Sequence, residues 1–195
     1  MRSSWVPSSS DAPGRGSTDT TLPAVATLVT AGTHEVPFYR LERVVGELAA
    51  RHVLPAPVLI QTGCAAGETA ACPPVTVVDF VEPSVLVQLM SVALFVITHG
   101  GPGSIFMALE AGHTPIAVPR SAVHGEHVDD HQSDFVQRMG ERCLVHAAPD
   151  PGAIGPLLAS LSTTRRAQPL ESDPIRRSSF IERFAPIADA LVRRS

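Results

Sequence analysis

The sequence predicts an α/β fold, namely a Rossmann-like parallel sheet of about six strands with helices on both faces. Short, wholly apolar runs alternate with longer amphipathic stretches along most of the chain. Strands of a parallel sheet read as continuous apolar runs because helices cover both of their faces. The 195 residues, 44% of them hydrophobic, with a mean hydropathy of +0.16, suffice for one such domain with tails.

The pattern assigns each element of this fold in chain order. The expected strands are the apolar runs at 24–30, 58–60, 75–80, 94–98, 115–118 and 143–146. The expected helices are the amphipathic stretches at 37–48, 83–90, 102–111, 126–139 and 151–161. Pro37 suits a first helical turn, whereas Gly112 and Gly140 suit helix ends.

The ends of the chain differ in composition from its middle. Residues 1–22 are rich in Ser, Pro, Gly, Asp and Thr, which is typical of a disordered leader. The α/β domain is expected at 23–162, and a linker at 163–173. Residues 174–195 predict an amphipathic helix, kinked at Pro186, that either packs back on the domain or docks on a partner.

Composition excludes several classes of protein. Charged residues make up only 17% and the net charge is -4, which argues against a nucleic-acid binder. The three cysteines form no CxxC pair, so a reducing compartment is favoured over a disulfide framework or a Cys-based zinc site. The longest apolar stretch, 85–98, is too short to cross a bilayer, and the N-terminus lacks a secretory pattern. Any role at a membrane is therefore expected to depend on a partner.

The loops that follow the strands are where ligands bind in an open parallel sheet. The loop HGGPGS at 99–104 has glycines that let a ligand approach the backbone closely, and Pro102 fits the first turn of the next helix. The amides of Gly103 and Ser104 would then lie at the positive end of the helix dipole and suit a phosphate. A glycine-rich turn that caps a helix and holds no ligand is the alternative.

The loop at 124–132 contains enough histidine and aspartate to raise the question of a metal. His127 and His131 are four residues apart and would share a helix face, as zinc ligands do. No HExxH pattern is present, however, and Asp129 and Asp130 also suit the start of a helix. Hydrogen bonding of sugar hydroxyls by His131 and Gln132 is the simpler interpretation, and no metal is expected.

Four segments in register resemble a known family. They are VTAGTHEVPF (29–38), IQTG (60–63), VITHGGPGSI (96–105) and GEHVDDHQ (125–132). Over about residues 25–160 the chain resembles the C-terminal, donor-binding domain of glycosyltransferase family 28. It looks closest to the stand-alone bacterial type of exopolysaccharide synthesis, which is similar to the soluble subunit of the eukaryotic dolichol-linked N-acetylglucosamine transferase. The resemblance implies one half of a GT-B fold.

The resemblance also implies a UDP-sugar donor, held without a metal or another cofactor. It places the diphosphate between the glycine loops at 30–34 and 99–104, the uracil near the end of the third strand and the sugar hydroxyls at the end of the segment 124–132. The corresponding residues are Gly32, Thr33, Gly101, Gly103 and Ser104 for the diphosphate, Phe80 and Val81 for the uracil, and His131 and Gln132 for the sugar.

The sequence departs from the family pattern in its ribose contact. The helix after the glycine turn usually carries a carboxylate that binds the ribose hydroxyls, and here that position is Met107. Glu110, one turn further along, is the candidate replacement. Leu94 also stands where an Asp is common. No general base is identified by the pattern, and His34 and His99 are the candidate catalytic residues.

The function that the resemblance implies is that of a catalytic subunit in a two-component, inverting glycosyltransferase. Such a subunit transfers a sugar from a UDP-sugar to a lipid-linked acceptor in polysaccharide biosynthesis. A membrane-anchored partner subunit supplies the acceptor side and recruits the cytoplasmic subunit to the inner face of the membrane. Two alternatives remain open: a non-catalytic module that only binds a nucleotide-sugar, and a UDP-sugar epimerase-type enzyme on the same fold.

Overall fold

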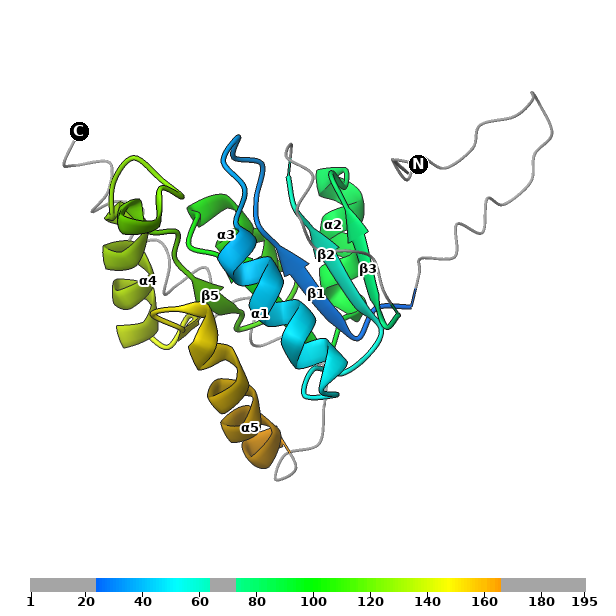
Figure 1. The fold of residues 1–195 in the computed structure, drawn as a ribbon. Coiled ribbons are helices and arrows are strands. Elements are labelled where there is room, and N and C mark those ends of the chain that lie inside the picture. The colour runs from blue at the N-terminus through cyan, green and yellow to red at the C-terminus, as the bar shows by residue number, and fades with distance from the viewer. Residues whose placement is uncertain (1–23, 64–72, 166–195) are drawn as a thin grey trace, which may run out of the picture.

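A computed structural model describes residues 24–63 and 73–165, which form a sheet between two layers of helices (Figure 1). Its strands are β1 (Thr27–Thr30), β2 (Val58–Gln61), β3 (Val75–Val78), β4 (Phe95–His99), β5 (Ile116–Val118) and β6 (His146–Ala147). They pair in parallel throughout, in the order β3-β2-β1-β4-β5-β6. The predicted fold class is thereby confirmed.

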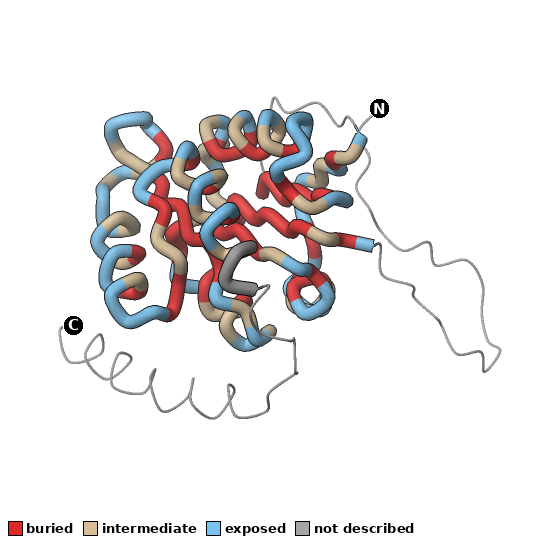
Figure 2. Tube along the Cα trace, turned by 90° about the horizontal axis from the view of Figure 1, so that it is seen from below, coloured by how far each residue is buried: buried red, intermediate tan, exposed pale blue. Residues whose placement is uncertain are grey.

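Helices cover both faces of this sheet. They are α1 (Tyr39–Ala50), α2 (Pro83–Val92), α3 (Pro102–Glu110), α4 (His131–Glu141) and α5 (Ile154–Arg165), with short 3-10 turns η1 (Ala122–His124) and η2 (Pro151–Ala153). Helices α1 and α5 pack on one face, whereas α2, α3 and α4 pack on the other (Figure 1). Figure 2 shows the buried strands enclosed by these layers.

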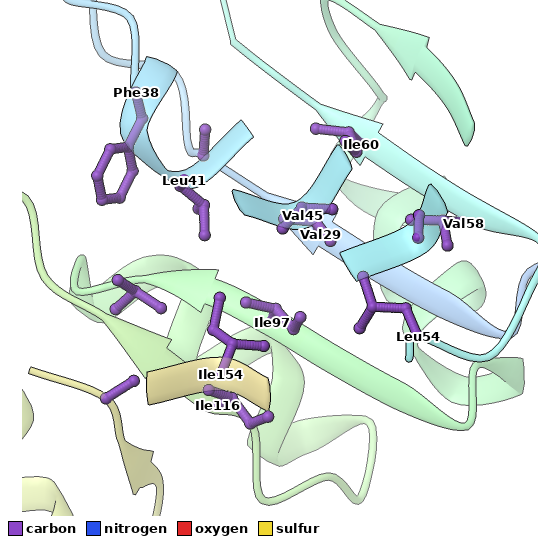
Figure 3. Close-up of a cluster of buried hydrophobic side chains, with 14 of the residues drawn as sticks. Val29, Phe38, Leu41, Val45, Leu54, Val58, Ile60, Ile97, Ile116 and Ile154 are labelled. Atoms are coloured by element: carbon purple, nitrogen blue, oxygen red, sulfur yellow. The ribbon is translucent and has the colours of Figure 1, made fainter. Parts of the chain in front are cut away.

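The main core follows directly from the register of the strands. Val29 is paired with Ile60 on one side and Ile97 on the other, and Ile97 is paired with Ile116. Paired residues of parallel strands point to the same face, so these four side chains form one apolar row across the sheet (Figure 3). The adjacent residue of β1, Leu28, points to the opposite face and joins the cluster under α2 and α3.

The fourth helix begins later than the sequence pattern predicts. The expected helix at 126–139 is α4, which starts only at His131, and residues 126–130 form a series of bends. Their polar groups are bonded elsewhere: the Glu126 carboxylate pairs with Arg40, and the Asp129 carboxylate accepts the His131 amide. The prediction that His127 and His131 share a helix face is therefore wrong, because His127 precedes the helix.

Other boundaries also differ. The last strand, β6, occupies His146–Ala147 rather than 143–146, because the chain first makes a left-handed turn at Cys143 (φ 56°). Helix α5 runs to Arg165, three residues into the predicted linker. The predicted leader at 1–22, the rest of the linker and the predicted helix at 174–195 lie outside the described residues. Within the described part, no helix has the length and apolarity that a membrane span requires.

Three helices end with the same pair of hydrogen bonds, a Schellman motif. After α3 the left-handed position is Gly112, whose amide donates to the Leu109 carbonyl while the His113 amide donates to that of Ala108. The equivalent positions after α1 and α4 are His52 and Cys143, which hold φ angles of 55° and 56°. A side chain at such a φ costs conformational energy that glycine does not.

We therefore expect Cys143→Gly to stabilise the fold by up to about 1 kcal/mol, since the relief of left-handed strain outweighs the added entropy of the unfolded chain. Gly112→Ala, whose new Cβ would meet nothing within 4 Å, is the matched control and should destabilise by about 1 kcal/mol. Urea unfolding followed by circular dichroism measures both. A loss of stability in Cys143→Gly would contradict the assignment.

Candidate functional site

The strand order places a topological switch point between β1 and β4. The chain leaves β1 toward α1 on one face of the sheet and leaves β4 toward α3 on the other. Doubly wound sheets bind their ligands outside the carboxyl ends of the strands at this point. Because Thr30 is paired with Thr98, the predicted loops at 30–34 and 99–104 start side by side there.

The imidazole of His99 lies between these two loops. A Cβ atom added to Gly32 or to Gly101 would overlap this ring, and Gly32 also has a φ of 82°. Packing against the His99 ring therefore requires glycine at both positions. The predicted reason, close approach of a ligand to the backbone, is not needed to explain either of them.

The surroundings of His99 keep its ring neutral. Burial, followed by the positive charge of Arg120 and smaller effects of His34 and His127, lowers the pKa of His99 to about 4, while the Thr30 backbone acts in the opposite direction. Its Nδ1 atom is buried and has no hydrogen-bond partner among the described residues. At neutral pH this histidine is an uncharged and weak base.

His34, the other candidate catalytic residue, is committed to its own loop. Its Nδ1 atom accepts a hydrogen bond from the Val36 amide at 3.1 Å. A neutral imidazole has one donor and one acceptor nitrogen, so its Nε2 atom carries the proton. In this state Nε2 can donate a hydrogen bond but cannot accept a proton from an acceptor hydroxyl. The ring lies against that of His127, with 5.3 Å between their centroids.

Helix α3 begins with donors that the protein leaves unused. Gly101 is the N-cap residue without a side-chain cap, and the first helical hydrogen bond runs from Ile105 to the Gly101 carbonyl at 3.3 Å. Within residues 24–63 and 73–165, nothing accepts a hydrogen bond from the amides of Gly103 or Ser104. A Cβ added to Gly103 would meet nothing within 4 Å. Such a helix start is suited to an anion.

The loop after β1 is held by buried polar side chains. The Gly32 amide donates to Thr30 Oγ1 at 3.2 Å, so it is already used inside the protein. The Gly32 carbonyl accepts from Gln61 Nε2 at 3.3 Å, and Thr30 Oγ1 donates to Gln61 Oε1 at 2.8 Å. Two residues of the IQTG segment thus support this loop. Gln61 forms hydrogen bonds with it, and Gly63 packs so closely that an added Cβ would overlap the Gly32 carbonyl oxygen. Of the two predicted diphosphate residues in this loop, Gly32 offers no free amide.

The residues predicted to bind the nucleoside are not all brought together. Phe80 is half-exposed after β3, whereas Val81 is buried in the cluster beneath α2 and α3. Met107 packs against that same apolar cluster. Glu110 is exposed at the last position of α3, about 10 Å along the helix axis from Gly103. The structure does not place Glu110 beside the unpaired amides.

The two predicted sugar-binding residues stand at the start of α4. The His131 side chain is 86% exposed, and its ring lies 3.8 Å from the Asp129 carboxylate. The Gln132 side chain lies beside Gly100, and its Oε1 atom accepts the Arg120 amide at 3.1 Å. Gln132 therefore keeps both Nε2 hydrogens and one lone pair of Oε1 for other partners. In the described parts of the chain, no three His, Cys, Asp or Glu side chains are arranged to hold a metal.

Arg120 is a buried residue of the site that the sequence pattern did not single out. Its guanidinium donates to the carbonyls of Val36 (2.7 Å), Ala31 (2.9 Å) and Glu126 (3.4 Å), and lies 4.9 Å from the centre of the Phe38 ring. Burial lowers its pKa, against the opposing effect of nearby carboxylates. A charged residue two positions after a wholly apolar strand, at the edge of the sheet where ligands bind, is the sequence feature that could have identified it.

Glu126 connects helix α1 to the loop after β5. Its carboxylate takes two hydrogen bonds from Arg40, at 2.8 and 3.1 Å, and one from the Ser121 amide at 3.1 Å. Arg40 lies in α1, so this nearly buried ion pair ties the first helix to the loop before α4. The 86-residue separation of the two side chains explains why local periodicity could not predict it.

Comparison with known proteins gives a family and a fold. The model of the glycosyltransferase family 28 C-terminal domain matches residues 26–173, and no curated protein matches the chain. The glycotransferase of kitacinnamycin has a similar fold, with a TM-score of 0.55 and 20% identity over 93% of this chain and 47% of its own. The glycosyltransferase SnogD from Streptomyces nogalater matches at 20% identity over 80% of this chain and 44% of its own, with a TM-score of 0.39.

This chain thus spans about half the length of the glycosyltransferases of known structure that it matches. The six-stranded parallel sheet of this chain matches about half of the glycotransferase of kitacinnamycin in fold. The family match, which covers most of the sequence, supports a role in sugar transfer or in the binding of its donor. On this evidence the chain belongs to glycosyltransferase family 28 and carries its C-terminal domain.

Proposed function

We propose that this chain is the donor-binding, catalytic subunit of an inverting glycosyltransferase. It takes a UDP-sugar and passes the sugar to a lipid-linked acceptor during polysaccharide biosynthesis. The observation that carries the proposal is the pair of unpaired amides, Gly103 and Ser104, at the switch point between β1 and β4. A diphosphate is the group of a nucleotide-sugar that this helix start suits best.

The chemistry follows from where negative charge develops. As the bond between the sugar and the diphosphate breaks, charge builds up on the departing phosphate oxygens. Oriented amides at a helix N-terminus stabilise that charge more than they stabilise the intact donor, which is what lowers a barrier. The acceptor hydroxyl attacks the opposite face of the sugar carbon and loses its proton to a base. The protein needs no covalent intermediate for this reaction.

The base is proposed to come from a partner subunit. His34 is bonded through Nδ1 to its own loop, and His99 has a pKa of about 4, so neither side chain is suited to accept a proton at neutral pH. A membrane-anchored partner that binds the lipid-linked acceptor would supply the missing group and close the site against water. It would also recruit this subunit from the cytoplasm to the inner face of the membrane.

One observation favours a second candidate, a module that binds a nucleotide-sugar without transferring it. Met107 packs in an apolar cluster at the position where the family usually has a ribose-binding carboxylate, and the nearest carboxylate on the helix, Glu110, lies exposed at the last position of α3. Transfer of radiolabelled sugar by this chain, reconstituted with its partner, distinguishes the two. Donor binding with no transfer would favour the module.

Gly103→Asp tests the anion site directly. The new carboxylate suits the first turn of α3 and has open space, so stability should stay within about 1 kcal/mol of wild type. Its charge repels a diphosphate, and we expect UDP affinity, measured by calorimetry, to fall at least about tenfold. Gly103→Asn is the matched control, with the same shape and no charge. Equal UDP affinities for the two variants would place the diphosphate elsewhere.

The neutral state of His99 predicts how stability depends on pH. An unfolded histidine takes up a proton near pH 6.5, whereas His99 in the fold does so only near pH 4. The free energy of unfolding should therefore be unaffected by this group above pH 6.5 and should fall by roughly 2–3 kcal/mol as the pH is lowered toward 4. Urea unfolding between pH 4 and 8 measures this loss.

His99→Asn should reduce that pH dependence, although it lowers stability at every pH by removing a packed ring. His146, whose pKa is also lowered by burial, contributes in the same direction, so His146→Gln serves as the comparison. If His99→Asn lost stability with acid as steeply as the wild type does, His99 would not be the neutral group inferred here.

A further inference from the structure

Arg120 carries a buried charge that forms no ion pair with a carboxylate among the described residues, although Glu126 and Glu42 lie near enough to raise its pKa. Its relative exposure is 0%, and the acceptors of its guanidinium are the backbone carbonyls of Ala31, Val36 and Glu126. Its Nε atom has no hydrogen-bond partner in the part of the chain that the structure describes. Burying a cation in this way costs free energy, so the arrangement calls for a reason other than stability.

The carbonyls that Arg120 contacts enclose the loop after β1. Ala31 and Val36 stand on either side of Gly32, Thr33 and His34, so one planar guanidinium holds both ends of this loop. The peptide plane from Ala31 to Gly32 is fixed on its other side as well, where the Gly32 amide donates to Thr30 Oγ1. The path of the backbone through Thr33 is set by these bonds.

Arg120 also acts on the other groups at the switch point. Its backbone amide occupies Gln132 Oε1 at 3.1 Å, which leaves the Nε2 hydrogens of that side chain for other partners. Its charge is, after burial, the largest influence that keeps His99 neutral. Arg120 thus forms hydrogen bonds to the loop after β1 and to the start of α4, and its charge acts on the His99 ring.

We propose that Arg120 is a positioning residue for the donor site: its guanidinium fixes the loop at 31–36 opposite the start of α3, and its amide turns the Gln132 side chain so that Nε2 faces the sugar. It does not itself touch the donor. This inference rests on the proposed function, since the donor that the loop serves is a UDP-sugar. Errors of about 1 Å in such loops reduce binding and catalysis by large factors.

The test uses the full chain with Arg120→Lys and Arg120→Met. Lysine keeps the charge but lacks the planar fork, whereas methionine lacks both. Both variants should bind UDP at least about tenfold more weakly by calorimetry. The pKa of His99, followed by NMR of its ring, should stay low in Arg120→Lys and rise toward 6.5 in Arg120→Met. The His99 pKa reports only that the charge is kept or lost, whereas a residue that only stabilises the fold would weaken UDP binding no more than Arg40→Met does at equal loss of stability.

Arg40→Met is the matched control. It breaks the ion pair that ties α1 to the loop before α4, and so costs stability close to the site, but it leaves the carbonyls of Ala31 and Val36 bonded to Arg120. UDP affinity in this variant should stay within about twofold of wild type. The proposal is overturned if Arg120→Lys binds UDP as wild type does, or if Arg40→Met loses as much affinity at equal loss of stability.

Failure of the proposed function would look different. If the wild-type chain does not bind UDP at all, the donor assignment fails, and the positioning role is decided by NMR alone. Shifts of the Gly32 and Thr33 amides in Arg120→Lys that are absent in Arg40→Met would support it. Unchanged amides in Arg120→Lys would refute it. If Arg120→Met does not fold, Arg120→Lys and Arg40→Met still decide the question.

Discussion

The site depends on the contact between the His99 ring and two glycines. Gly32 and Gly101 belong to loops that leave neighbouring strands in opposite directions, and the imidazole fills the space that side chains would otherwise take at both. This contact fixes how far apart the loop after β1 and the start of α3 can be. The width of the His99 ring therefore sets the distance between the unpaired amides of α3 and the loop after β1.

A network of buried polar groups holds this geometry. Gln61, from the end of β2, bonds the Gly32 carbonyl, and Arg120, from the end of β5, bonds the Ala31 carbonyl. Such bonds are strong in a low-dielectric interior and costly when left incomplete, so they favour a single arrangement of the loops. These loops therefore keep one arrangement without a ligand, which the proposed stabilisation of a departing diphosphate would require.

Sequence reasoning succeeded where physical patterns are local. The wholly apolar runs that became β1, β2 and β4 predicted a buried parallel sheet, and the loops after β1 and β4 were identified because glycine and proline mark them. It failed where a partner lies far along the chain. The late start of α4 follows from the pairing of Glu126 with Arg40, and no local period reports on a contact 86 residues away. For Gly32 and Gly101 the sequence suggested a ligand, and the structure adds a second reason, the packing of the His99 ring against both of them.

The interlocking of His99 with its two glycines has an evolutionary consequence. Any side chain at either glycine position requires the imidazole to leave, and a smaller residue in place of the imidazole opens both positions at once. A single replacement at Gly32 or Gly101 would produce a steric clash, and replacement of His99 by a smaller residue would leave a cavity. We therefore expect these three positions to change together among relatives of this domain. Joint changes would mark the lineages in which the contact between the loop after β1 and the start of α3 has been replaced by another.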